Sequence, residues 1–530
     1  MASRHGPLRI RKPTASAYGA LAVLAVVSLP ALIALGLSSP GSDSVSLDFL
    51  RRAVSFTLLQ ASLSTVISVG LGVVLARALS RRHFIGRALM LRLFALPQAL
   101  PVLVAVLALV SLYGRAGYLS HIWPDLPSIY GLNGILLAHV FFNLPYAALL
   151  TLIALQQVPR EQWRLAQMLG MSERAIFRVI EWPVLQTALP GIAGLIFMLC
   201  VTSFTIVLTL GGGPAATTLE LAIYQALRFD YDPGLALALA MGQIGLCALL
   251  LSFLARFKPP FAESSRLSIG PERASLTRPG NPVPDMAIII LAALFILLPI
   301  LSVFLSGMHA DFARILREPI LWRAIATSGT IALAAAIIAV LIAYPLALAA
   351  IRLESKGATK RARLFEAPVE LTLLLPPVLL GAGWFLILRP TASSVGYAPA
   401  LIVLINAIMA LPFVYRSLSA SLRRLVANED PLCESLGISG FARFRLIDWP
   451  VLKPAFRAAF TFAFLLSFGD FGVIAFFGSD SIVTLPFLIF QRLGSYRTDD
   501  AAGIALILAF FSILMTQLFS AFGRKEHAHD

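Results

Sequence analysis

Charged residues are scarce in this chain. Asp, Glu, Lys and Arg make up 13% of its 530 residues, whereas 58% of the residues are hydrophobic. A soluble globular protein is about one quarter charged, so a water-exposed surface over the whole chain is excluded and much of it must face lipid. Cysteine is scarce too. Cys200, Cys247 and Cys433 lie in apolar or helical contexts without metal-ligand spacing, which gives no disulfide framework and no metal site.

The chain also lacks a phosphate-binding loop of the Walker A type. That loop needs a lysine directly after a glycine, and no glycine in this sequence is followed by lysine. If ATP drives this protein, another polypeptide must hydrolyse it. We predict no catalytic residue and no cofactor on this chain.

Long apolar stretches are abundant, and twelve of them are long enough to span a bilayer. They cover approximately residues 17–37, 54–78, 90–113, 132–156, 189–211, 234–256, 285–307, 324–351, 369–389, 397–419, 457–478 and 501–523. The first follows a basic stretch, as a signal peptide would. Its length of about 20 residues favours a retained helix.

Basic residues are distributed unevenly between the loops. With the N-terminus in the cytoplasm, 32 of the 42 Lys and Arg residues fall on the cytoplasmic side. Because cytoplasmic loops collect Lys and Arg, we expect both termini inside. The same bias explains the net charge of +15 without nucleic acid as a partner. The arginines of Ala310–Arg323 fall on the other side, so we expect an amphipathic interfacial helix there.

The polar, proline-rich segment 258–284 divides the chain. It cannot span a membrane and is predicted to be a cytoplasmic linker. The expected organisation is a first repeat of six membrane helices in residues 1–257 and a second in residues 285–530.

Two cytoplasmic loops, 160–188 and 427–455, match at a constant offset of 267 residues. Each is predicted to form helix, glycine break, helix. Gly170 and Gly437 supply turns that other residues would strain, and Ser172 and Ser439 can cap the second helix. Each second helix carries apolar residues about one turn apart and is expected to end at a proline before the next span. These positions are Ile176, Phe177, Ile180 and Pro183 in the first copy, and Phe441, Phe444, Ile447 and Pro450 in the second.

The spacing Gly-x9-Ile-x-Trp-Pro in both loops resembles the coupling-loop signature of ABC importer permeases. The family's opening Glu-Ala-Ala triad is replaced by residues 164–166 and 431–433, which read Arg-Leu-Ala and Pro-Leu-Cys. The resemblance implies that each loop seats in a cleft of an ATPase subunit, so that a homodimer binds both. The implied coupling residues are Leu169, Gly170, Phe177, Ile180, Pro183, Leu436, Gly437, Phe444, Ile447 and Pro450.

A narrower resemblance covers most of the chain. Two matched halves in one chain are similar to the fused permeases of ferric-iron and thiamine importers, and the segments Thr202–Gly234 and Ser467–Leu508 look like the thiamine permeases. This implies a bacterial inner-membrane ABC importer permease of all-α fold. It would receive thiamine or its phosphates from a periplasmic binding protein, with ATP and Mg on the separate ATPase. A ferric-iron permease, an ion-coupled secondary transporter and a scaffold without transport activity stay open as alternatives.

Asp470 is an ionisable residue inside the predicted span 457–478. Such groups are costly in a membrane and usually face a cavity or a partner. It could line the translocation path and attract the thiamine cation, or it could cap a helix break beside Gly469 and Gly472. Ser203 and Thr205 occupy the similar place in the first half and carry no charge.

Overall fold

The computed structural model describes residues 15–37, 47–82, 84–125, 127–254, 256, 282–372, 375–388, 394–438, 440–479, 482–495 and 497–521. Within these ranges the chain is helical, and an isolated antiparallel bridge between Ser479 and Ile482 is the one β feature. The all-α prediction is therefore confirmed. Residues 258–281 of the predicted linker lie outside the described residues.

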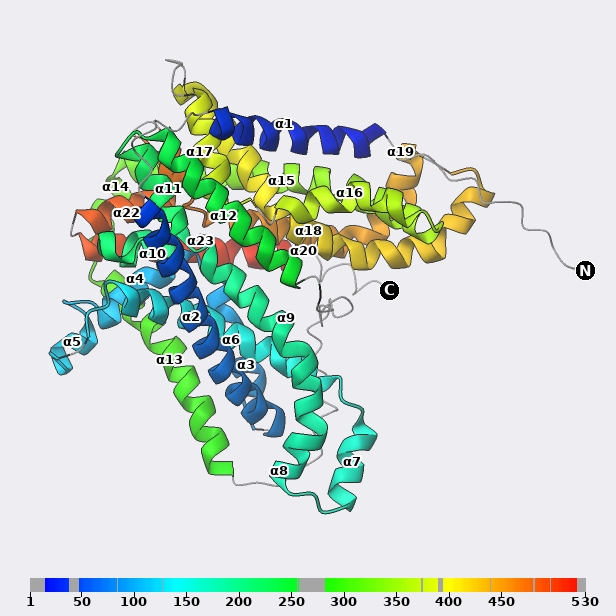
Figure 1. Cartoon of the computed structure of the whole chain (residues 1–530), viewed down its shortest axis with the longest axis horizontal. Helices are drawn as coiled ribbons and strands as arrows, with labels where there is room; N and C mark the ends of the chain where they lie inside the picture. Colours follow the sequence, from blue (N-terminus) through cyan, green and yellow to red (C-terminus); the bar gives the residue numbers. More distant parts are fainter. Residues whose placement is uncertain are drawn as a thin grey trace, which may run out of the picture. The chain divides into compact units, whose positions relative to one another are not determined.

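The helices follow in chain order, with η marking 3-10 or π turns (Figure 1). They are α1 (Ala15–Leu37), α2 (Leu47–Arg81), α3 (Arg87–Ala99), α4 (Val102–Tyr113), α5 (Tyr118–Ile122), α6 (Leu132–Gln156), α7 (Arg160–Met168), α8 (Glu173–Ile176), η1 (Phe177–Glu181), α9 (Trp182–Val201), α10 (Phe204–Leu210), η2 (Pro214–Ala216), α11 (Leu219–Arg228) and α12 (Pro233–Leu254). The others are α13 (Pro282–Met308), α14 (Phe312–Arg317), α15 (Pro319–Ser355), α16 (Thr359–Leu371), α17 (Pro377–Leu388), α18 (Ser394–Ser435), α19 (Gly440–Arg443), η5 (Phe444–Asp448), α20 (Trp449–Phe468), α21 (Ile474–Phe477), α22 (Leu485–Gly494) and α23 (Thr498–Ala521).

Eleven helices in the described part are long and apolar enough to cross a membrane, and α17 is a shorter apolar helix. The membrane fold is thus confirmed, while the number of twelve spans stays a prediction. Two of the predicted spans, 90–113 and 369–389, are each divided into two helices. The first is divided at Leu100–Pro101, where Leu100 is extended. The second is divided before Pro377. In both places proline removes a backbone donor and disfavours a helical conformation in the preceding residue.

The helix expected over Ala310–Arg323 is shorter in the structure, and its interfacial position stays a prediction. Only the six residues of α14 form a short helix, and Pro319 begins α15, so Arg323 belongs to the following span. Proline at the first position is compatible with a helix start because no donor is needed there. Arg314 of α14 forms an ion pair with Asp500, which accounts for one of the arginines on that side.

Contacts divide the chain into two compact units, and these do not coincide with the two sequence halves. Unit 1 contains residues 1–39, 316–488 and 507–530, and unit 2 contains residues 40–315 and 489–506. The first helix of each half therefore packs in the unit built mainly by the other half. The boundaries of the sequence repeats stay a prediction.

In unit 1, α1 lies along α15 and α17 (Figure 1). The indole of Trp384 donates a hydrogen bond to the carbonyl of Val27 at 2.8 Å. A Cβ on Gly383 would lie 2.3 Å from the carbonyl oxygen of Ala31, so this close approach requires glycine. Small residues at such contacts let membrane helices pack backbone to backbone.

In unit 2, α13 packs against α4, α2 and α3. The hydroxyl of Ser302 donates to the carbonyl of Ala108 at 2.9 Å, which satisfies a polar group between apolar helices. At the N-terminal end of α13, Arg82 Nε lies 2.8 Å from Asp285 Oδ2. An acid in the first helical turn also complements the helix dipole. These contacts fix both ends of α13 within its unit.

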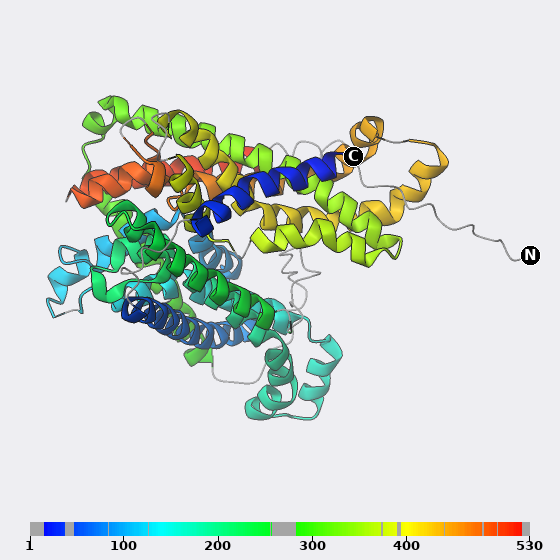
Figure 2. The same cartoon turned by 45° about the horizontal axis from the view of Figure 1, so that its top comes forward.

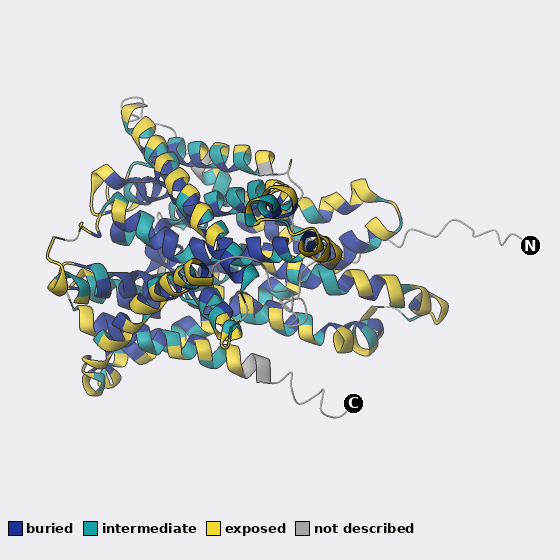
Figure 3. Ribbon diagram, turned by 90° about the horizontal axis from the view of Figure 1, so that it is seen from below, coloured by how far each residue is buried: buried dark blue, intermediate teal, exposed yellow. Residues whose placement is uncertain are grey.

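Exposed residues follow the outer faces of the helices (Figure 3). Many of them have large apolar side chains. Examples are Val66, Leu249, Leu291, Leu341 and Phe510, each more than half exposed. An exposed apolar surface of this extent fits lipid and not water. The predicted lipid-facing character of the chain therefore has a direct structural counterpart.

Candidate functional site

The predicted loop 160–188 forms a helical hairpin that projects from unit 2 (Figure 2). Its first helix, α7, ends in a Schellman turn, in which Met171 N donates to Ala166 O and Gly170 N donates to Gln167 O, both at 3.0 Å. Gly170 has φ of +58°, a conformation that favours glycine. The Ser172 hydroxyl accepts from Ala175 N at 3.4 Å. The predicted turn and cap are thus confirmed in this copy.

The hairpin has a small core of its own. Trp163, Ala166, Ile176 and Ile180 are buried together with Val158. The tip is different, because the side chains of Leu165, Met168 and Leu169 are more than half exposed. Of the predicted coupling residues, Leu169 is therefore an exposed apolar side chain at the tip, while Ile180 packs inside and holds the hairpin together.

The second loop, 427–455, repeats the turn in unit 1. Ile438 N donates to Cys433 O at 2.9 Å, and Gly437 has φ of +65°. The side chains of Leu432, Leu436 and Phe441 are exposed. Ser439, the predicted cap of this copy, lies outside the described residues. The two tips share a backbone turn and an apolar exposed surface.

Both hairpins contain a π-helical turn at the same place. It covers residues 177–181 (η1) in the first copy and 444–448 (η5) in the second, directly before the Trp-Pro pair. Pro183 and Pro450 were expected to end the helix. That expectation is wrong, because single helices run over Glu173–Val201 and Gly440–Phe468. Proline lacks a donor and crowds the carbonyl four residues before it, and a wider turn with i→i+5 bonding accommodates both effects.

A buried acid precedes each Trp-Pro pair, and the sequence interpretation missed both. Glu181 is fully buried, with Arg77 Nε at 2.7 Å and Arg81 Nη2 at 3.9 Å from its Oε2. Because Arg77 and Arg81 lie in the last turns of α2, this pair ties the hairpin to a distant span. An acid at both positions 181 and 448, again 267 apart, is the signal that could have revealed the pair.

In the second copy the acid has other partners. Asp448 accepts from Arg443 Nε at 3.1 Å and from the Tyr344 hydroxyl at 2.6 Å. Arg443 also pairs with Asp430, whose other oxygen lies 3.1 Å from Arg352 Nε. Arg443 and Asp448 are both buried, so each charge depends on this ring of partners.

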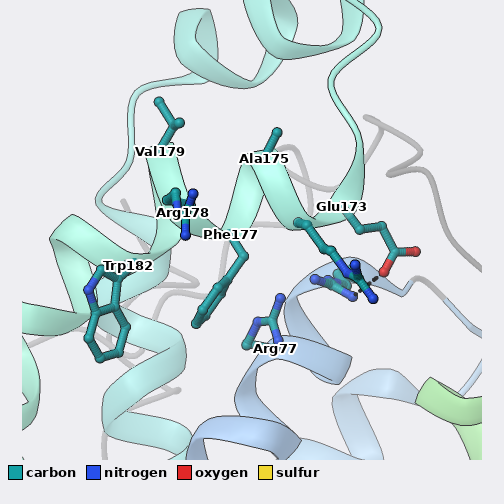
Figure 4. A pocket seen from close by; sticks show the side chains of 9 residues that line it. Arg77, Glu173, Ala175, Phe177, Arg178, Val179 and Trp182 are labelled. Carbon is teal, nitrogen blue, oxygen red and sulfur yellow. Dashed lines mark hydrogen bonds and ion pairs between the residues drawn. The ribbon is translucent and has the colours of Figure 1, made fainter.

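A cavity of about 820 Å³ opens beside the first hairpin (Figure 4). Its lining comes from the end of α2 and from the second hairpin helix. The lining residues are Arg77, Arg81, Glu173, Arg174, Ala175, Phe177, Arg178, Val179 and Trp182. The guanidinium of Arg77 lies over the ring of Phe177, 4.2 Å from its centroid, at a distance typical of a cation–π contact. We call this cavity the arginine pocket.

The predicted path residues lie at helix breaks. In the second half, α20 ends at Phe468, and the Asp470 carboxylate accepts from Gly472 N at 3.2 Å and Val473 N at 3.3 Å. Asp470 therefore does cap the break, as one of the two sequence interpretations expected. The side chain is still partly exposed, so a role in the path stays a prediction.

In the first half, α9 ends at Val201 and Ser203 precedes α10, with Thr205 in its first turn. His139 of α6 bridges two serines, with Nε2 2.7 Å from Ser203 Oγ and Nδ1 2.9 Å from Ser64 Oγ. Ser203 Oγ also donates to the Cys200 carbonyl at 3.0 Å. A hydroxyl donates once, so in a neutral His139 ring Nε2 carries the proton and the Ser64 hydroxyl donates to Nδ1. The first break is thus bridged by a histidine and two serines, and these contacts include no carboxylate.

Long apolar helices together with two matched hairpins are typical of a membrane transport subunit. The family model of the binding-protein-dependent transport system inner membrane component matches residues 68–261. The chain is a multi-pass inner-membrane permease of this class and not an enzyme.

Relatives narrow the class further. The thiamine transport system permease protein ThiP of Brucella abortus (strain 2308) is 46% identical, covering 97% of this chain and 96% of the relative. The protein of the same name from Escherichia coli (strain K12) is 41% identical over 97% of both. That of Haemophilus influenzae is 39% identical over 87% of both. The chain belongs to the family of thiamine transport system permease proteins.

Proposed function

We propose that this chain is the permease through which an ATP-driven importer takes up thiamine or its phosphates by alternating access. The proposal rests mainly on the pair of hairpins. Both have a glycine in the left-handed conformation, a π turn before Trp-Pro and an exposed apolar tip. The substrate is inferred from the relatives, whose names assign them to thiamine transport. A secondary transporter would have no use for two such hairpins.

The proposed partner of the hairpins is a homodimer of a separate ATPase, which binds ATP and Mg²⁺. Two similar tips on one chain suit two identical grooves, into each of which a short amphipathic helix can lay its apolar face. Leu169 and Leu436 would contact the ATPase. Phe177, Ile180, Phe444 and Ile447 are half-buried or buried and would transmit movement from the tips to α9 and α20. In this arrangement both termini lie in the cytoplasm, and a periplasmic binding protein delivers the substrate on the opposite side.

The test is reconstitution in lipid vesicles with the ATPase and the binding protein encoded beside it. We expect thiamine to stimulate ATP hydrolysis and uptake, and we expect uptake to persist when a proton ionophore is added. Stimulation by ferric iron in place of thiamine, or uptake without the ATPase, would contradict the proposal. Leu169→Asp with Leu436→Asp should abolish ATPase binding, whereas Thr359→Asp, an added carboxylate on an exposed site outside both hairpins, should not.

We propose that three residues at the helix breaks face the substrate path, which opens alternately to the outside and the inside. These residues are Asp470, Ser203 and Thr205. Asp470→Asn keeps an oxygen that can cap the break but removes the charge. We expect slower thiamine uptake with unchanged thermal stability. Equal uptake by the wild type and Asp470→Asn would leave Asp470 with the capping role alone.

A further inference from the structure

The arginine pocket carries more positive charge than its acids neutralise. Four arginines line it, and two of them are engaged: Arg77 with Glu181, and Arg81 with Glu173 at 3.3 Å and with Glu181. The other two, Arg174 and Arg178, are exposed and have no acidic partner in the part of the chain that the structure describes. They lie four residues apart on the second hairpin helix, and Figure 4 shows Arg178 beside the labelled aromatic residues. The pocket thus has a surplus of positive charge, which favours an anion.

The pocket lies at the ends of two helices that are long and apolar enough to span a membrane. Arg77 and Arg81 belong to the last turns of α2, and Trp182 is the first residue of α9. Trp182 is 41% exposed. Tryptophan beside arginine at the end of a span is typical of the headgroup region of a bilayer. Phe177, Val179 and Trp182 give the pocket an apolar wall next to its charges.

The second half reproduces the charge only in part. Thr57 and Ser328 both accept from the first amide of a following helix, Leu219 N at 3.0 Å and Leu485 N at 2.8 Å. Aligning α2 with α15 through this pair places Leu348 opposite Arg77. The hairpin offset of 267 residues places Phe441 opposite Arg174. By the same two alignments Arg352 stands opposite Arg81 and Arg445 opposite Arg178. Arg77 and Arg174 are therefore the arginines that distinguish the first copy, and this difference favours a ligand at the first pocket.

We propose that the arginine pocket binds the phosphate headgroup of an anionic phospholipid, of the phosphatidylglycerol type. Guanidinium groups match phosphate oxygens in a bidentate fork, and basic pockets beside membrane helices bind anionic headgroups. Arg174 and Arg178 supply the free donors. The bound lipid bridges the first hairpin to α2, next to the Glu181 ion pair.

The test measures lipid binding to the purified full-length chain in detergent by native mass spectrometry, without ATPase or thiamine. Short-chain phosphatidylglycerol, short-chain phosphatidylcholine and inorganic phosphate are titrated separately. The pocket variant is Arg174→Gln with Arg178→Gln. The matched control, Arg424→Gln with Arg445→Gln, removes two exposed arginines from the second half.

We expect phosphatidylglycerol to bind and phosphatidylcholine not to bind. Each interfacial arginine contributes roughly a factor of five, so the pocket variant should bind about 25-fold more weakly and the control within about twofold. Equal losses in both variants, or equal binding of the two lipids, would overturn the proposal. Inorganic phosphate binding as tightly as phosphatidylglycerol would show a small-anion site and overturn the lipid assignment. Because both altered arginines are exposed, an unchanged thermal midpoint checks folding.

Discussion

The two hairpins reach the same turn by different routes. In the first, α6 ends at Gln156 and Pro159 precedes α7, so the outer helix is separate from its span. In the second, Val426 stands where the first has Pro159, and α18 runs without interruption from Ser394 to Ser435. Pro159 coincides with the break, and its missing donor and fixed φ disfavour a continuous helix there. Proline alone does not force a break, because α18 contains Pro399, Pro412 and Pro431. The shared glycine turn nevertheless survives in both copies.

Their charges are also arranged differently. Glu181 depends on arginines of α2, whereas Asp448 depends on Arg443 of its own hairpin and on Tyr344. The first hairpin is therefore tied to a distant span, and the second is held mainly by a ring that includes its own helix. What the copies keep is the buried acid before Trp-Pro, and not the residue that pairs with it.

The largest expected difference in stability between the two copies comes from removing one arginine in each. Arg443→Leu leaves Asp448 buried with only the Tyr344 hydroxyl, and breaking a buried pair costs about 3 kcal/mol. Arg77→Leu, which installs the residue found at position 348, should cost about 1 kcal/mol because Arg81 still faces Glu181. The thermal midpoint of the purified chain in detergent measures both.

The control for this comparison is Arg423→Gln. Arg423 forms an exposed ion pair with Glu354, and such pairs contribute little, so its midpoint should match the wild type. A loss for Arg77→Leu as large as that for Arg443→Leu would contradict the different arrangement of charges in the two copies.

A second difference between the two halves lies in α11 of the first and α22 of the second, which are outside the membrane-spanning helices. Glu220 is buried in the first turn of α11, and neither carboxyl oxygen has a hydrogen-bond partner among the described residues. The second half has Pro486 there. Burial raises the pKa of Glu220 from 4.5 to about 8, because the charged form loses its hydration.

The raised pKa makes stability depend on pH. Between about pH 4.5 and 8 the folded chain keeps a proton that the unfolded chain releases, so stability falls as pH rises and levels off above about 8. Glu220→Gln should remove this slope and stabilise the chain at pH 8.5, because the amide carries no charge that burial would penalise. Thermal midpoints from pH 5 to 9 test it, with exposed Glu161→Gln as control. An unchanged slope in Glu220→Gln would show that Glu220 is not the titrating group.

The features of the hairpins that depend on the local sequence were predictable. The features that depend on packing with distant segments were not. Gly170 and Gly437 were found because a left-handed turn restricts the residue type. The π turns were missed because a proline normally signals a helix end, and its accommodation depends on the next turn of the helix. The exchange of α1 and α13 between the units has no sequence signal, since one apolar helix face resembles another. Glu181 and Asp448 were overlooked because an acid in a loop usually lies in water.

The smallest effect should be equal in both copies. At Gly170 and Gly437 a Cβ would meet no atom within 4 Å, so alanine there adds backbone strain alone, about 1 kcal/mol in each hairpin. We expect Gly170→Ala and Gly437→Ala each to weaken ATPase binding about fivefold, measured by pull-down with the purified ATPase. Gly329→Ala, also free of contacts but inside the helix α15, should not weaken it, because alanine favours a helix. Weakening by only one glycine variant would show that the ATPase depends on the two tips unequally. The two halves would then differ in function at the docking surface as well as in the ion pairs of Glu181 and Asp448.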